Sequence, residues 1–141
     1  MKRFYAVIDT NVIVSALISS HSNAATVLML KYVFDGNVIP LFNEEILEEY
    51  KEVLKRKKFK LPDYLINTVI ETIKSNGIFL GRTKTTEAIP DDKDIVFYEV
   101  KLSKEDSFLI TGNIKHFPKT PFVVTPSEML NIINESNNFH D

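Results

Sequence analysis

Short apolar runs alternate with longer amphipathic segments along this chain, and the two patterns predict strands and helices in turn. The short runs are rich in Val, Ile and Phe, as buried strands are. Five such runs are expected to form strands, at residues 2–9, 38–42, 78–80, 107–111 and 122–125. Apolar positions recur with helical spacing in further segments, at residues 10–19, 24–34, 43–57, 62–76, 92–102 and from 126 onward.

Residues at the ends of these segments support the predicted boundaries. Ser22 or Asn23 can cap the helix that begins at residue 24, and Gly36 and Gly77 follow predicted helices as C-terminal glycines do. The end of the chain is polar, and residues 135–141 are expected to form a disordered tail.

Strands that alternate with helices connect through right-handed crossovers and form a parallel sheet with helices on both faces. We therefore expect an α/β fold with three α/β/α layers and a central, mostly parallel five-stranded sheet. A chain of 141 residues is long enough for one such domain, which we place at residues 1–134.

Asp9 directly follows the first and most apolar strand. In an open parallel sheet, ligands bind just outside the carboxyl ends of the strands. Asp9 could instead cap the next helix, but Thr10 and Asn11 are also able to do so. Because a carboxylate at the end of a buried strand is costly to desolvate without a partner, a functional role is the better interpretation of Asp9.

The helix predicted at residues 43–57 carries several glutamates, which their angular positions separate. Its buried stripe consists of Ile46, Leu47, Tyr50, Val53 and Leu54. Glu48 and Glu52 point away from that stripe, whereas Glu49 lies at its edge. Glu49 is therefore the glutamate that can reach inward over the core.

Three aspartates, Asp91, Asp92 and Asp94, surround the start of a helix that is apolar on nearly every side. One carboxylate is enough for the cap, and carboxylates this close raise one another's pKa unless a cation compensates. Asp94 lies in the first turn and is the better metal ligand. Asp91 or Asp92 is the better cap.

The fourth predicted strand ends in Thr111, which Gly112 and Asn113 follow. If this strand lies beside the first, Asp9 and Asn113 flank the topological switch point of the sheet. Asn113 could be a neutral oxygen ligand, a donor to substrate or a turn residue. His116 is interpreted as a loop packing residue. Carboxylates that converge on one end of a sheet favour a hard cation, and an open cation site favours phosphate chemistry.

The composition of the chain limits how it can attract nucleic acid, which metal ligands it has and where in the cell it is expected. The net charge of −2 provides no overall attraction to nucleic acid, so RNA contacts depend on local patches such as the basic residues 55–60. Taken alone, such a patch is better interpreted as a solvated helix end. The absence of cysteine excludes disulfides, thiol catalysis and thiolate metal sites. No signal peptide or membrane-length apolar run is visible, so the cytoplasm is the expected location.

In this order, the segments resemble a PIN domain, the small nuclease fold of many bacterial toxin–antitoxin toxins. The resemblance rests on Asp9 within residues 8–11, on Glu49, on Asp94, and on residues 109–113 at the place of the family's usual strand-Thr-Gly-Asp ending. It covers nearly the whole chain in element order and spacing, and it implies a PIN-like, Rossmann-related fold.

The resemblance implies a Mg²⁺- or Mn²⁺-dependent endoribonuclease that hydrolyses phosphodiester bonds of single-stranded RNA as the toxin of a toxin–antitoxin pair. Its catalytic residues would be Asp9, Glu49 and Asp94, and its metal ligands the same three with Asp91. The auxiliary polar residues would be Asn11, Thr111 and Asn113, and the RNA-binding residues Lys57, Lys58 and Arg82. A small antitoxin and a second copy of the chain are the implied protein partners.

One residue departs from the family pattern. The usual fourth acid is Asn113 here, which weakens the binding of a second cation, although Asp91 could replace the lost charge. The alternative to an active nuclease is a catalytically impaired RNA- or protein-binding module. Phosphoryl transfer through an aspartyl phosphate at Asp9 ranks lower, because Asn11 stands where such folds place a second aspartate.

Overall fold

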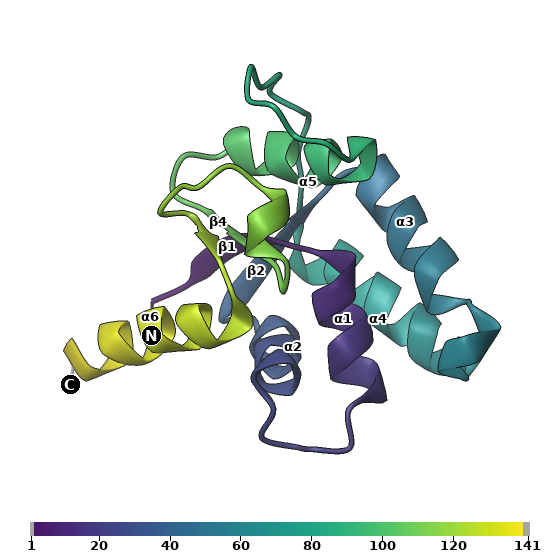
Figure 1. Cartoon of the computed structure of the whole chain (residues 1–141). Helices are drawn as coiled ribbons and strands as arrows, with labels where there is room; N and C mark the ends of the chain where they lie inside the picture. The colour runs from purple at the N-terminus through teal and green to yellow at the C-terminus, as the bar shows by residue number, and fades with distance from the viewer. Residues whose placement is uncertain (1, 140–141) are drawn as a thin grey trace.

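The computed structural model describes residues 2–139 and shows a five-stranded parallel sheet between helices (Figure 1). The strands are β1 (Phe4–Ile8), β2 (Val38–Phe42), β3 (Ile78–Phe79), β4 (Phe108–Ile110) and β5 (Val123–Val124). The α-helices are α1 (Thr10–Ile18), α2 (Ala25–Asp35), α3 (Glu44–Leu54), α4 (Asp63–Asn76), α5 (Asp92–Leu102) and α6 (Pro126–Phe139). Two 3₁₀ helices are η1 (Lys57–Phe59) and η2 (Ile114–His116). The predicted α/β/α fold is confirmed.

The order of the strands creates the ligand-binding position of the sheet. The order is β3-β2-β1-β4-β5, so the chain first proceeds to one side of β1 and then crosses to the other. In the register of β1 and β4, Ile8 lies opposite Ile110. The residues that follow these strands therefore emerge at the same level, at the switch point between β1 and β4.

Helices cover both faces of the sheet. α5 packs against β1, β2 and β4 on one face, while α2 lies on the opposite face and contacts α6 (Figure 1). The apolar stripe of α3 is buried through Ile46, Leu47, Tyr50 and Leu54. That stripe therefore belongs to the core and is not a free interface.

Two glycines are required by the backbone around them. Gly36 ends α2 with φ of 84°, in the left-handed region that favours glycine. A Cβ on Gly77 would lie within 2.5 Å of the backbone oxygens of Pro40 and Ile73, so the chain can pass from α4 into β3 only with glycine there. Both glycines end helices as predicted.

Three predicted boundaries are wrong. α3 ends at Leu54, before residue 57, because the exposed residues 55–58 contribute nothing to its buried stripe. Neither Ser22 nor Asn23 caps α2, whose N-cap is Ala24 without a side-chain bond. The expected tail is helical through residue 139, since α6 packs on α2 and buries Met129 and Ile133. Residues 140–141 of that tail lie outside the described residues.

Candidate functional site

Asp9 stands at the N-cap position of α1, but its carboxylate does not cap that helix. Its Oδ2 atom accepts hydrogen bonds of 2.7 Å from Thr111 Oγ1 and 3.3 Å from Asn11 Nδ2. Asp9 is 7% exposed, and no basic side chain within residues 2–139 forms an ion pair with it. Burial raises the pKa of Asp9, the Thr111 hydroxyl opposes this, and the Glu49 carboxylate raises it further. The carboxylate is therefore neither a cap nor half of an ion pair.

The turn that follows β4 is fastened to the end of β1. Thr111 is fully buried, and its hydroxyl donates to Asp9 while it accepts the backbone N–H of Asn113 at 3.0 Å. Asn11 joins the same two segments, because its Nδ2 donates to Asp9 and its Oδ1 accepts the Gly112 N–H at 3.3 Å. The exposed side chain of Asn113 forms no hydrogen bond with the described residues. Thr111 and Asn11 thus orient Asp9, and the side-chain amide of Asn113 is outside this network.

Glu49 reaches the same end of the sheet from α3. Its Oε2 atom accepts a 2.5 Å hydrogen bond from Thr10 Oγ1. The adjacent Tyr50 is buried and donates its hydroxyl to the carbonyl of Ile8, the last residue of β1. Burial, with the carboxylates of Asp9 and Glu49, raises the pKa of Tyr50 well above its ordinary value, so the phenol remains a donor. The inward position of Glu49 predicted from its helical angle is confirmed.

The start of α5 supplies the third carboxylate. Asp91 is the N-cap, and its Oδ1 accepts a 2.9 Å hydrogen bond from the backbone N–H two residues on. Asp94 lies in the first turn with a side chain 15% exposed, and its Oδ2 is 3.5 Å from Nδ1 of His116. Burial raises the pKa of Asp94 to about 6, the carboxylates of Asp9 and Asp91 contribute, and His116 opposes the rise. Of the two predicted candidates for the cap, Asp91 and Asp92, it is Asp91 that caps α5.

These carboxylates form a cluster with little compensating charge. As it stands, no set of three or more His, Asp or Glu side chains in the described part of the chain is arranged to hold a metal ion. Burial is the main reason for the raised pKa of Asp94, and the Asp9 carboxylate adds to it, so the two carboxylates lie within electrostatic reach of each other. Mg²⁺ characteristically binds through one or two carboxylates and completes its shell with water and substrate phosphate. Two converging carboxylates therefore fit a hard cation whose other ligands are water and substrate.

A family model of the PIN domain matches residues 5–115, a segment that contains every carboxylate described above. The chain belongs to the PIN-domain family. No curated protein and no solved structure matches it. PIN domains are generally nucleases that use divalent metals, so membership supports a nuclease-like hydrolase. No helix within residues 2–139 of this PIN domain has the length and apolarity needed to cross a membrane.

Beside the carboxylates, this PIN domain has a groove of about 510 Å³ between α3 and α5, here called the acidic groove. Its charged lining residues are Glu44, Glu45, Glu48, Glu49, Glu52, Asp92 and Lys93. Ile46, Val96 and Phe97 provide the apolar part of the lining. Glu45, Glu48 and Glu52 pair with Arg82, Lys51 and Arg56, but the six carboxylates still outnumber these cations and Lys93, so this surface is repulsive to phosphate groups.

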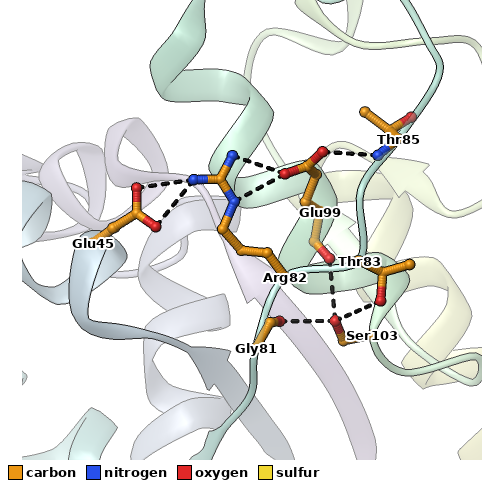
Figure 2. A network of polar contacts seen from close by, with 7 residues as sticks. All are labelled: Glu45, Gly81, Arg82, Thr83, Thr85, Glu99 and Ser103. Atoms are coloured by element: carbon orange, nitrogen blue, oxygen red, sulfur yellow. Dashed lines mark hydrogen bonds and ion pairs between the residues drawn. The ribbon is translucent and has the colours of Figure 1, made fainter.

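Arg82 was predicted to bind RNA, and this role stays a prediction. Figure 2 shows its guanidinium between two carboxylates, 3.0 Å from Glu45 and 2.8 Å from Glu99. The buried Glu99 also accepts the backbone N–H of Thr85 at 2.8 Å, which is the main reason why its pKa is lowered; Arg82 acts in the same direction. Arg82 therefore fastens the loop after β3 to α3 and α5, and its charge is already paired.

Lys57 and Lys58 lie exposed on η1. This segment is at the end of α3 that points away from α5 (Figure 1). The Nζ atom of Lys58 is 5.1 Å from the centre of the Phe59 ring. Contact of these lysines with RNA stays a prediction, and it would involve nucleotides beyond those at the carboxylates.

Three polar residues of the site were not assigned a role there from the sequence. Thr10 was considered only as a cap, Tyr50 only as part of the apolar stripe, and His116 only as a packing residue. A usable signal existed for Tyr50, because a buried phenol needs a hydrogen-bond partner. Thr10 and His116 depend on pairings across the fold, and no local pattern of the sequence distinguishes them.

Proposed function

We propose that this PIN domain is a Mg²⁺- or Mn²⁺-dependent endoribonuclease that hydrolyses phosphodiester bonds of single-stranded RNA. The observation that supports this most is the pair Asp9 and Asp94, two largely buried carboxylates that converge at the switch point with raised pKa. His116 is the basic side chain paired with either of them among residues 2–139. A buried cluster of carboxylates is typical of cation-binding sites.

Asp9 and Asp94 would hold the cation directly. The side chains of Thr111 and Asn11 both donate to Oδ2 of Asp9, so Oδ1 would be the oxygen that binds the cation. When bound, the cation polarises a phosphoryl oxygen and lowers the pKa of a coordinated water. Asp91 has one oxygen engaged at the helix N-terminus, so its contribution to the metal is through charge or through its second oxygen.

Glu49 would orient the attacking water. Thr10 holds Oε2 of Glu49 at 2.5 Å, which restricts the carboxylate and leaves Oε1 to accept a hydrogen bond from water. Tyr50 anchors the same turn of α3 to the end of β1. A positioned carboxylate beside the metal ligands can then accept the proton of the attacking water as the new bond to phosphorus forms. The bond from phosphorus to the leaving ribose oxygen breaks, and solvent water supplies the proton for that oxygen.

The same proposal extends to the biological role, a cytoplasmic toxin that is restrained by a small antitoxin. The acidic groove supports this partner, since its carboxylates and apolar floor complement a basic amphipathic segment and repel RNA. A homodimer is part of the proposal and awaits measurement of the molar mass in solution. Growth arrest on expression of the wild type, and none with Asp9→Asn, is the expected result for a toxin.

The decisive experiment for the nuclease is cleavage of an end-labelled single-stranded RNA with Mn²⁺. Asp9→Asn is expected to abolish cleavage, whereas Glu71→Gln, which removes an exposed carboxylate of α4, should retain it. Calorimetric titration with Mn²⁺ accompanies the assay and should show binding that Asp9→Asn loses. Cleavage that persists in Asp9→Asn would show that the activity comes from elsewhere.

An RNA- or protein-binding module without catalysis is the second candidate. Asn113 favours it, as does the lack of a ready-made set of three ligands within residues 2–139. This module would retain RNA or partner binding but take up Mn²⁺ feebly and cleave nothing. The paired titration and cleavage assays separate the two candidates.

A further inference from the structure

A second groove of about 510 Å³ borders the carboxylates on the side away from α3 and α5, and it is here called the neutral groove. Its polar lining residues are Asn11, Ser15, Thr26, Asn113 and Ser127. Its other lining residues are Val12, Ala24, Ala25, Gly112 and Pro126. None of these ten side chains carries a charge, in contrast to the acidic groove.

The side chain of Asn11 links the neutral groove to Asp9. Asn11 lines the groove and donates to Asp9, and Gly112 lines it and donates to Asn11. α1, the start of α2, the turn after β4 and the start of α6 thus surround a groove that is one side chain away from Asp9. A ligand in this space would lie next to a phosphate bound at the carboxylates.

The charges that line the acidic groove and the neutral groove favour different ligands. An RNA strand that followed the acidic groove would place its phosphates among six carboxylates, of which only Glu45, Glu48 and Glu52 form ion pairs within residues 2–139. The neutral groove has no such penalty, and no side chain caps the N-terminus of α2 at its edge, where the helix dipole is positive. A single strand is therefore directed into the neutral groove.

Asn113 is the residue of this groove whose chemistry is otherwise unexplained. Its side-chain amide makes no hydrogen bond with the described residues, whereas both the nitrogen and the oxygen of the Asn11 side-chain amide are hydrogen-bonded. An aspartate at position 113 would add negative charge where a strand passes. The neutral amide instead offers both a donor and an acceptor to a nucleotide.

The lining also indicates how a nucleotide would be recognised. No aromatic side chain lines the groove, so sequence-tolerant stacking is not available there. Hydroxyl and amide groups line it instead, and these read the edges of unstacked bases or the 2′-hydroxyl. The volume is within the range of small-molecule sites, about 300–1,000 Å³, and is enough for one nucleotide.

We propose that the neutral groove is the subsite for the nucleotide adjacent to the cleaved phosphate, and that Asn113 contacts this nucleotide and is not a metal ligand. This inference rests on the proposed ribonuclease function, since the bound phosphate at Asp9 defines the register of the strand. It also explains why a neutral residue stands where the family's pattern has an acid.

Two substitutions test the subsite. Asn113→Ala removes the free amide, and Thr26→Val removes a hydroxyl of the lining without a change of shape. Each is expected to lower the preference for one base at one position beside the cut by about threefold to tenfold, as the loss of one hydrogen bond does. The Mn²⁺ dissociation constant should stay within about twofold of wild type. Thr68→Val, an exposed threonine of α4, is the matched control and should change neither quantity.

A binding measurement in EDTA provides a readout independent of cleavage. Titration with a single-stranded RNA tetranucleotide should shift the backbone amide resonances of Ser15, Thr26 and Asn113. Those of Glu48 and Val96 in the acidic groove should not move. Shifts confined to the acidic groove, or no binding at all, would overturn the inference.

The outcomes distinguish this inference from the proposed function. If wild type cleaves RNA and both variants keep its base preference, the subsite is wrong and the nuclease stands. A Mn²⁺ affinity that falls tenfold or more in Asn113→Ala would make Asn113 a metal ligand and overturn the subsite. If wild type does not cleave but the tetranucleotide shifts the neutral groove, the ribonuclease proposal fails while the nucleotide site stands.

Discussion

Replacement of Asp94 by asparagine is expected to stabilise the metal-free protein while it removes the activity. The carboxylate of Asp94 is only 15% exposed and faces the carboxylates of Asp9 and Asp91. Its ionisation is therefore unfavourable in the folded state, although the neighbouring His116 reduces the cost. Asparagine has nearly the same shape but cannot ionise, so it is free of this cost.

The magnitude follows from the pKa of Asp94, which rises from 3.8 to about 6 on folding. A rise of about two units corresponds to about 3 kcal/mol at neutral pH. Because the folded pKa lies above the unfolded one, the folded protein binds more protons between these two values, and stability falls as the pH rises through that window. The cost is absent below pH 3.8 and complete above pH of about 6.

Thermal unfolding in EDTA at pH 3.5 and pH 7.5 tests this reasoning. At the higher pH, Asp94→Asn should raise Tm by roughly 5–10 °C, the shift that about 2–3 kcal/mol gives a domain of this size. At the lower pH the two proteins should unfold together. Saturating Mn²⁺ should raise the Tm of wild type and leave the variant unchanged, because a ligand stabilises only the protein that binds it.

Asp92→Asn is the matched control, since Asp92 lies in the same first turn but is exposed. It removes the same formal charge and should lower stability by about 0.5 kcal/mol, the value of one acidic side chain at a helix N-terminus. A lower Tm for Asp94→Asn, an equal gain at both pH values, or an equal gain for Asp92→Asn would refute the argument from buried like charges.

Three further substitutions probe the contacts around the site. Thr111→Val removes the hydroxyl donor to Asp9, which should raise the pKa of Asp9 further and weaken Mn²⁺ binding about tenfold by calorimetry. Tyr50→Phe leaves the buried carbonyl at the end of β1 without its donor and should cost about 1–3 kcal/mol in urea unfolding. Glu99→Gln breaks the ion pair with Arg82 and should cost about 1–2 kcal/mol at pH 7, a range reduced because the guanidinium is 35% exposed. The lowered pKa of Glu99 means that this stability is present above its ordinary value of 4.5 and is lost as the pH falls through the folded pKa, so the difference from wild type should shrink in acid.

The parts of the fold that depend on local signals were predictable. β2 and α4 begin and end where their apolar patterns and flanking residues indicated, and Gly36 and Gly77 end their helices. Errors arose where a local signal was absent or was overridden by packing. α2 begins at Ala25 without a side-chain cap, and the polar end of the chain stays helical because α6 packs on α2.

The ion pairs of Arg82 were missed for a related reason. In the sequence, a cation in a polar loop has no visible partner, because Glu45 and Glu99 are 37 and 17 residues away. Only the packing of that loop against α3 and α5 brings the three side chains together (Figure 2). Lys57 and Lys58, in contrast, are exposed in the structure. Their predicted contact with RNA remains a prediction.

The carboxylate site depends on one further piece of information, the order of the strands. Thr111 and Asp9 are 102 residues apart, yet each follows its strand directly, and the register pairs Ile8 with Ile110. Once β1 and β4 are neighbours, the hydrogen bond between these side chains follows from the register alone. The sequence pattern indicated which residues end the strands but not which strands pair, and it therefore predicted the members of the site better than their contacts. Transfer of Asp9 to another strand end would not rebuild the site, because only the switch point presents a hydroxyl from β4 and a carboxylate from α5 to the same side chain.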